Sequence, residues 1–180
     1  IEHGAKPDAT IMELFQTTGA SLCTTLSPAL PYALFDRSIS HTSEIEQYNG
    51  NMVFEGIIAC SKAALEAGIP VALGNDVGCP WITQYDFWRE LVYFCRYVGV
   101  TPAFSLYSAT LGNAQIAGID DVTGSLEPGK HADMIVTDAN PLDDLTTLRN
   151  VRHVVRDGVF IAEPHVKRKP EVNRELDKFL

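Results

Sequence analysis

Residues 1–118 alternate between short apolar runs and longer stretches with helical periodicity, and this alternation constrains the fold more than any other feature. The runs "IEH" (1–3), "SLCTT" (21–25) and "IPVALG" (69–74) have the length of strands. The third run is apolar on both faces, which is typical of a buried parallel strand. The order strand–helix–strand predicts a parallel sheet with right-handed crossovers, so this part is expected to be an α/β unit.

Local capping signals place helices between these runs. Asp8 can cap a helix over about residues 9–18, and Ser43 with Glu46 has the spacing of a capping box for a helix that continues to about residue 67. Gly50 is expected to delay the firm start of that second helix. The segment 26–42, "LSPALPYALFDRSISHT", is predicted to be a long loop.

The pattern changes after residue 118. A hairpin turn is predicted at Glu127–Gly129 and a strand through Met134–Val136. Asp157–Gly158 separates two short apolar runs and is the strongest hairpin signal in the chain. A small antiparallel β unit is therefore expected to follow the α/β unit, and the last residues predict a terminal helix.

Composition limits the class of function. The chain of 180 residues is 46% hydrophobic and 21% charged, with a net charge of −9. Nucleic acids and anionic membranes need a basic footprint, so neither is expected as a partner. No stretch approaches the roughly 20 apolar residues of a membrane span. The four cysteines lack CxxC spacing, which favours free thiols in a reducing, cytoplasmic compartment.

His3 and Asp76 are the candidate metal ligands. Each follows a predicted strand directly, and they lie 73 residues apart with one strand between them. That is about 36 residues per βα unit, near the ~31 of a (β/α)₈ barrel, whose strand ends share one rim. Imidazole and carboxylate are ligands that Zn²⁺ accepts. A structural histidine and a turn aspartate are the alternatives on position alone.

The sequence motifs around these residues resemble those of the amidohydrolase superfamily, in its prolidase-like and imidazolonepropionase-like group. The stretches are "IEHG", "GNDVG" and the long "TPAFSLYSATLGNAQIAGIDDVTGSLEPGKHADMIVTDANPL". The resemblance covers essentially the whole chain and fits the family's C-terminal portion. It implies the last strands and helices of a TIM-like (β/α)₈ barrel over residues 1–118, the C-terminal part of a small β-sandwich over 119–163, and a helical tail over 164–180.

The resemblance also implies roles. His3 matches the metal-binding histidine of the sixth barrel strand, and Asp76 matches the eighth-strand aspartate that binds metal and shuttles protons. One or two divalent ions, expected to be zinc, would need further ligands from an N-terminal part that this chain is expected to lack. The chain by itself is therefore expected to be inactive.

Other side chains near the expected rim are weaker candidates. His41 and Arg37, in the predicted loop, are candidate substrate contacts, with ordinary surface positions as the alternative. Cys79, Trp81 and Trp88 could line the site, but packing is the favoured interpretation. His131 and His153 fall in the β unit and are expected to be structural. Prolidase-like members often carry His–Gly where this chain has Gln84–Tyr85, which leaves the substrate open.

Two classes of function remain. The first is a metal-dependent amidohydrolase that cleaves an amide bond of a small molecule: an Xaa-Pro or other dipeptide, or an N-acyl amino acid. Hydrolysis of a cyclic amide, as in imidazolonepropionase, is the alternative within this class. The second class is a non-catalytic assembly or binding module with the same fold. Retention of both His3 and Asp76 favours the enzyme, and a homo-oligomer is expected.

Overall fold

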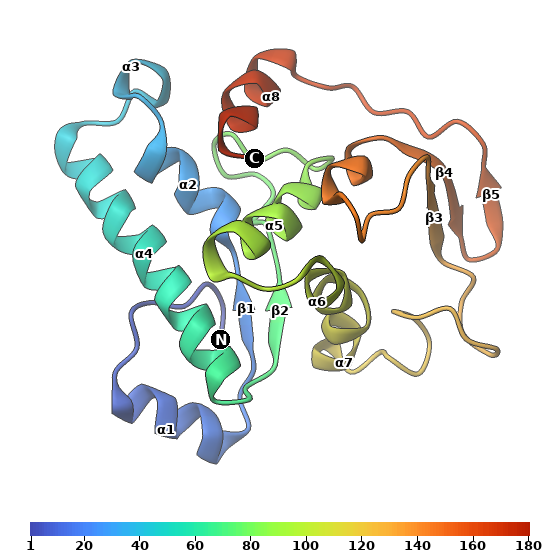
Figure 1. Cartoon of the computed structure of the whole chain (residues 1–180), viewed down its shortest axis with the longest axis horizontal. Helices are drawn as coiled ribbons and strands as arrows, with labels where there is room; N and C mark the ends of the chain where they lie inside the picture. Colours follow the sequence, from blue (N-terminus) through green and yellow to red (C-terminus); the bar gives the residue numbers. More distant parts are fainter.

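The computed structural model describes residues 1–180 and shows a mixed α/β architecture (Figure 1). The strands are β1 (Leu22–Thr24), β2 (Val71–Leu73), β3 (Met134–Thr137), β4 (Val151–Arg156) and β5 (Val159–Ile161). The α-helices are α1 (Ala9–Thr18), α2 (Leu26–Leu34), α3 (Arg37–Ser40), α4 (Glu44–Glu66), α5 (Phe87–Tyr93), α6 (Pro102–Tyr107), α7 (Asn113–Ala117) and α8 (Pro170–Leu176). Two π-helical segments, η1 (Phe94–Val98) and η2 (Ser108–Gly112), and two 3₁₀ segments, η3 (Leu145–Arg149) and η4 (Asp177–Phe179), complete the elements.

Three parallel segments lie side by side, as the sequence predicts. β1 pairs with β2 in parallel, with Leu22 opposite Val71 and Thr24 opposite Leu73. The predicted first strand is reduced to one parallel bridge between Glu2 and Cys23. These segments do not close a barrel within this chain.

The local capping predictions for two helices are confirmed. The Asp8 side chain accepts a hydrogen bond from the Ile11 amide at the start of α1. Ser43 and Glu46 form the complete capping box of α4. The expected delay at Gly50 is wrong, because α4 begins at Glu44. Gly50 serves close packing instead: a Cβ atom there would lie 2.7 Å from the Cβ of Tyr32 on α2.

The predicted loop over residues 26–42 is also wrong, since this segment forms α2 and α3. The prolines suggested a loop, yet Pro31 lies inside α2. The buried side chains of α2 recur at helical spacing and pack against α4; they include Leu26, Ala29, Leu30 and Ala33. Pro31 cannot donate a main-chain hydrogen bond, which destabilises the helix. Burial of this apolar face offsets that cost.

The region after residue 118 contains the predicted antiparallel unit. β3, β4 and β5 form one sheet in that order. Asp157 (φ 49°) and Gly158 (φ 77°) make the β4–β5 turn in the left-handed conformation that a tight hairpin requires. The Lys130 amide donates to the Glu127 carbonyl at 3.2 Å, so a turn forms there, but the predicted hairpin is wrong because no strand precedes the turn. The chain forms a single antiparallel sheet rather than two packed sheets.

The terminal helix is confirmed as α8, and it returns to the parallel part of the chain. Leu176 is buried in the main core, and Phe179 stacks on Phe35 with ring centroids 5.6 Å apart. The Arg89 side chain donates to the Asp177 carboxylate at 2.6 Å. The division of the chain at residues 118 and 163 stays a prediction.

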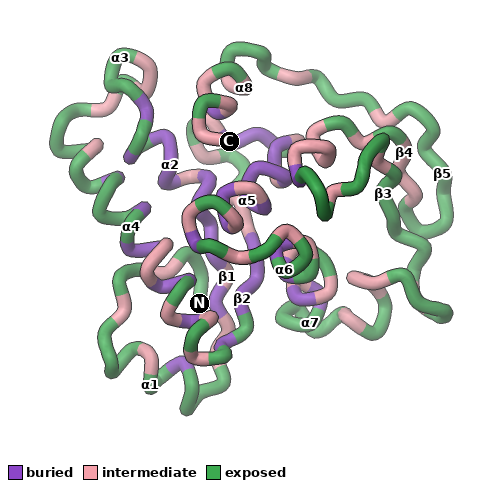
Figure 2. The backbone as a smooth tube through the Cα atoms, viewed as in Figure 1, coloured by how far each residue is buried: buried purple, intermediate pink, exposed green.

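Burial is concentrated around β1, β2 and the helices beside them, as Figure 2 shows. No helix combines the length and the apolar character needed to cross a membrane. All four cysteines are free, and burial raises the pKa of the Cys60 and Cys95 thiols.

Candidate functional site

His3 and Asp76 come together at the carboxyl ends of the parallel segments. The Nδ1 atom of His3 lies 3.3 Å from Oδ2 of Asp76. Their side chains are 50% and 38% exposed, so the pair is open to solvent. The chain thus brings an imidazole and a carboxylate, 73 residues apart in sequence, into direct contact.

Both residues have a left-handed backbone, which turns the chain sharply away from its strand. The φ angle is 62° at His3 and 45° at Asp76. This conformation costs an L-residue roughly 1–2 kcal/mol and persists where the surroundings enforce it, often at functional sites. At His3 the main-chain amide is held by the Cys23 carbonyl at 2.8 Å.

Thr25 is a third member of the cluster that the sequence analysis missed. Its Oγ1 atom lies 2.8 Å from His3 Nδ1, and the residue is 1% exposed. Thr25 directly follows β1, as His3 and Asp76 follow their own strands. That shared position is the sequence signal that could have identified it.

Glu90 on α5 was also missed. It is fully buried, and its two carboxylate oxygens accept hydrogen bonds from the amides of Leu26 (2.6 Å) and Ser27 (2.7 Å). Burial raises the pKa of Glu90 to about 7 and the Asp76 carboxylate acts in the same direction, while the hydrogen bonds from Ser27 and Leu26 oppose them. An acidic residue within the apolar stretch "FWRELVYF" was the available signal.

The pair fits part of a metal site. A neutral imidazole nitrogen and a carboxylate oxygen are ligands that divalent zinc takes. The described chain holds no group of three or more His, Cys, Asp or Glu side chains that could enclose an ion. His3 and Asp76 can therefore supply two ligands, whereas a catalytic zinc takes three protein ligands and a water.

The two predicted substrate contacts lie apart from this pair. Arg37 faces Glu44, with Nη1 and Oε2 3.8 Å apart, and its side chain is half exposed. His41 ends α3 with a φ angle of 58° and is exposed. Neither side chain contacts His3 or Asp76, and their role stays a prediction.

The remaining candidates have mainly structural contacts. The Cys79 amide donates to the Asp76 carbonyl at 3.1 Å, which closes the turn after Asp76. The Trp81 ring packs edge-on to Phe35, with centroids 5.0 Å apart. Trp88 is buried, and its ring is contacted by the guanidinium groups of two arginines, Arg89 and Arg149.

The two histidines of the β unit also make local contacts. His131 Nδ1 lies 3.8 Å from Asp157 Oδ1. His153 Nδ1 lies 2.7 Å from the Ala162 carbonyl oxygen. Neither histidine contacts the His3–Asp76 pair.

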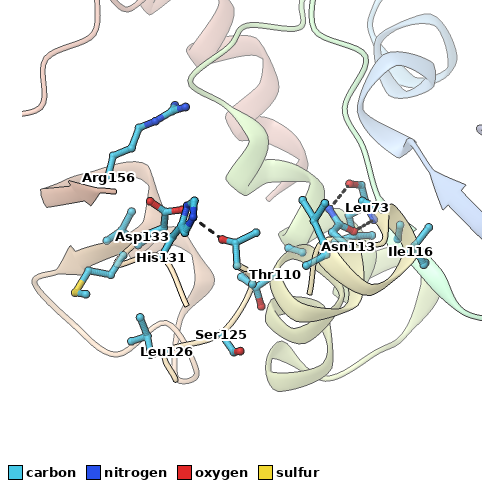
Figure 3. Close-up of a pocket in the computed structure, with 18 of the residues that line it drawn as sticks. Leu73, Thr110, Asn113, Ile116, Ser125, Leu126, His131, Asp133 and Arg156 are labelled. Atoms are coloured by element: carbon cyan, nitrogen blue, oxygen red, sulfur yellow. Dashed lines mark hydrogen bonds between the residues drawn. The ribbon is translucent and has the colours of Figure 1, made fainter. Parts of the chain in front are cut away.

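A cavity of about 1590 Å³ opens beside the parallel segments but does not include this pair. Glu2, Cys23 and Ala72 line it from the parallel segments, and η2, α7 and the antiparallel sheet line its other sides. Figure 3 shows Asn113 and Leu73 on one side of it and His131, Asp133 and Arg156 on the other. The cavity is therefore the open face of the strands, distinct from their carboxyl ends.

Asn113 occupies the free edge of β2 in this cavity. Its side-chain oxygen accepts from the Leu73 amide, and its side-chain nitrogen donates to the Leu73 carbonyl, both at 2.9 Å. One amide side chain thus satisfies two main-chain groups that a neighbouring strand would otherwise pair.

Two solved structures share the architecture. A candidate prolidase from Bifidobacterium longum is 37% identical with a TM-score of 0.94, and the match covers 99% of this chain and 45% of that one. An Xaa-Pro dipeptidase, solved with methionine bound in its active site, is 30% identical with a TM-score of 0.78, covering 91% and 39%.

Sequence comparison agrees. The 5-methylthioadenosine/S-adenosylhomocysteine deaminase of Teredinibacter turnerae is 33% identical over 175 residues, which are 91% of this chain and 38% of the deaminase. Imidazolonepropionases are also among the relatives. The chain spans less than half the length of these proteins. Its residues 1–161 match the Amidohydrolase family. The chain belongs to the amidohydrolase family.

Proposed function

We propose that this chain supplies two metal ligands, His3 and Asp76, to a metal-dependent enzyme that hydrolyses an amide bond of a small molecule. The observation that carries the proposal is the 3.3 Å contact between the imidazole and the carboxylate at the strand ends. The likeness to a candidate prolidase and to an Xaa-Pro dipeptidase favours Xaa-Pro or other dipeptides, or N-acyl amino acids, as substrates.

The chemistry requires a water molecule to attack the carbonyl carbon and a proton to reach the leaving amine. A bound divalent ion, expected to be zinc, would polarise the carbonyl group and lower the pKa of water. Asp76 then serves as the base that takes the proton of the attacking water at a carboxylate oxygen and returns it to the amine nitrogen. His3 Nδ1 lies beside Thr25 and Asp76, so Nε2 is the proposed ligand atom of His3. Asp76 lies on the other edge of the ring and would hold the second ion of a two-ion site.

The further ligands come from outside these residues. Two ligands do not hold a catalytic zinc, and the segment of residues 1–3 pairs only with β1, which leaves its other edge for additional barrel strands. The N-terminal part of the same protein is the proposed source. A cytoplasmic location, a homo-oligomeric state, and substrate contacts by Arg37 and His41 stay predictions.

A second candidate is hydrolysis of a cyclic amide or of a ring-bound amino group. The imidazolonepropionase and deaminase relatives favour it. The non-catalytic module is disfavoured, because both the proton-shuttling carboxylate and the imidazole are retained.

The test uses the full-length protein that contains this chain. Zinc content is measured by elemental analysis, and hydrolysis is assayed with Xaa-Pro dipeptides, N-acyl amino acids, imidazolonepropionate and 5-methylthioadenosine. We expect Asp76→Asn to lower kcat by about 10²–10⁴-fold, as loss of a proton-transfer group does. His3→Ala should lower the zinc content.

His165→Ala is the matched control, because it removes an exposed imidazole from the tail and should change neither quantity. Unchanged zinc content and unchanged turnover in both His3→Ala and Asp76→Asn would refute the proposed function. The isolated 180-residue chain should show no turnover.

A further inference from the structure

The N-terminus of α2 is capped in an unusual way. Thr25 is its N-cap residue, but the Thr25 side chain makes no capping hydrogen bond to its own helix. A threonine at this position ordinarily accepts a hydrogen bond from the second or third amide of the helix. Here the hydroxyl lies 2.8 Å from His3 Nδ1 instead.

Glu90 takes over the capping role from α5. Its carboxylate accepts the amides of Leu26 and Ser27, the first two residues of α2, and also the Ser27 hydroxyl. A buried carboxylate is costly unless it is fully hydrogen-bonded, and a helix N-terminus is a favourable place for negative charge. Because Glu90 satisfies these amides, the Thr25 hydroxyl is available to another partner.

The neighbours of His3 lie on the Nδ1 side of its ring. An ionised aspartate can only accept hydrogen bonds, and Asp76 Oδ2 lies 3.3 Å from His3 Nδ1. Thr25 Oγ1, at 2.8 Å, is the closer of the two atoms that face Nδ1. Nε2 makes no hydrogen bond within the chain, so it is the ring nitrogen that is open to an ion.

We infer that Thr25 and Glu90 are positioning residues for His3: Glu90 caps α2 and frees Thr25, and Thr25 fixes the imidazole so that Nε2 faces an ion. This inference rests on the proposed function, since it takes His3 to be a metal ligand. Hydrogen bonds to the second nitrogen of a ligating histidine fix its tautomer and orientation, and their loss typically costs 10–100-fold in metal affinity or activity.

The experiment measures the zinc dissociation constant of the full-length protein by competition with a chelating dye, together with kcat and KM. Thr25→Val, which is close to isosteric, should weaken zinc binding by about 10–100-fold. KM should change little, because Thr25 does not touch substrate. Thr25→Ser keeps the hydroxyl and should restore zinc affinity. Glu90→Gln should weaken zinc binding by about tenfold or less, because Glu90 affects His3 only indirectly, through Thr25.

Thr24→Val is the matched control. Thr24 is equally buried, but its hydroxyl accepts from Ser61 at 2.8 Å and has no contact with His3. This variant should change stability and leave the zinc dissociation constant unaltered. Should Glu90→Gln fail to fold, Thr25→Val decides alone.

The outcomes separate the two proposals. Wild-type zinc affinity in Thr25→Val, with zinc lost in His3→Ala, would overturn the positioning role and leave the proposed function standing. Equal losses in Thr24→Val and Thr25→Val would also overturn it, since they would indicate general destabilisation. Retention of zinc by His3→Ala would overturn both.

Discussion

The parallel strands and the antiparallel sheet are both built from apolar residues, but they bury these residues to very different extents. Leu22 and Leu73 on the parallel strands are 0% and 3% exposed. Val159 and Phe160 on β5 are 64% and 60% exposed. After residue 118, the only residues in the buried apolar core are Leu145 and Leu176, from η3 and α8.

The difference lies in what each sheet packs against. β1 and β2 both contact α4, and β2 also contacts η2 and α7, whereas β3–β5 pair chiefly with each other (Figure 1). The same β-forming residue types are therefore held by tertiary packing in one region and by main-chain pairing and a tight turn in the other. Sequence pattern alone does not distinguish these two situations.

The sharpest test of this contrast compares two phenylalanines. Phe94→Ala removes a side chain that is 0% exposed and should cost about 3–5 kcal/mol of unfolding free energy. Phe160→Ala removes one that is 60% exposed and should cost less than about 1 kcal/mol. Denaturant unfolding of both variants measures the difference. Equal losses would show that β5 packs as deeply as α5 and η1, contrary to the structure.

A smaller contrast concerns two glycines with positive φ. Gly4 (φ 92°) sits beside the buried core, and a Cβ there would lie 2.9 Å from Cys60 Sγ. Gly158 (φ 77°) has nothing within 4 Å of its Cβ position. Gly158→Ala should therefore lower the free energy of unfolding by about 1–2 kcal/mol, the cost of a left-handed backbone for an alanine. Gly4→Ala should cost about 1–3 kcal/mol more, because it also overpacks the core.

The double variant Gly4→Ala/Cys60→Ala provides the control, since it removes the Sγ atom. It should recover part of the excess cost, as measured by the denaturation midpoint. No recovery relative to Cys60→Ala alone would place the cost in the Gly4 backbone or in the remaining contacts with Cys60 Cβ (3.0 Å) and Leu22 Cδ1 (3.3 Å).

A third contrast, of similar size to that of the glycines, is one of pH dependence. The pKa of Glu90 is about 7, above its ordinary value of 4.5, so the folded state binds the extra proton between these pH values. Stability from this group is present at low pH and is lost as pH rises toward and through 7. The stability advantage of the metal-free wild type over Glu90→Gln should therefore be larger at pH 5 than at pH 8, by roughly 1–3 kcal/mol.

Glu127 gives the matching control in the exposed part of the chain. Contacts with Ser125 and Lys130 lower the pKa of its carboxyl group. Because its pKa is lowered in the folded state, any change for Glu127→Gln between pH 5 and pH 8 should be small and of opposite sign. A pH-independent difference for Glu90→Gln, measured by thermal unfolding, would mean that Glu90 keeps its charge when buried.

Sequence reasoning succeeded where the signal was local or periodic. The caps at Asp8 and Ser43 depend on residues three positions away. Asp157–Gly158 adopts the backbone that its residue types favour. The proximity of His3 and Asp76 was also predicted, because ends of parallel strands meet at one edge.

It failed where a distant residue decides the local structure. The segment from Leu26 to Leu34 becomes a helix because α4 covers its apolar face and Glu90 caps its first amides. Leu26 and Glu90 are 64 residues apart in the sequence. The contact between Thr25 and His3 spans 22 residues and depends on strand register. No pattern within a local window carries this information.

The amide of Asn113 has a consequence for sheet growth. Main-chain groups at Leu73 point toward the free edge of β2, and both are already taken by this side chain. Any incoming strand that adds to β2 must stop short of Leu73 or expel the amide. Asn113 therefore limits the register in which another strand can pair with β2. It also protects this edge against unwanted strand addition, to which an unpaired edge is prone.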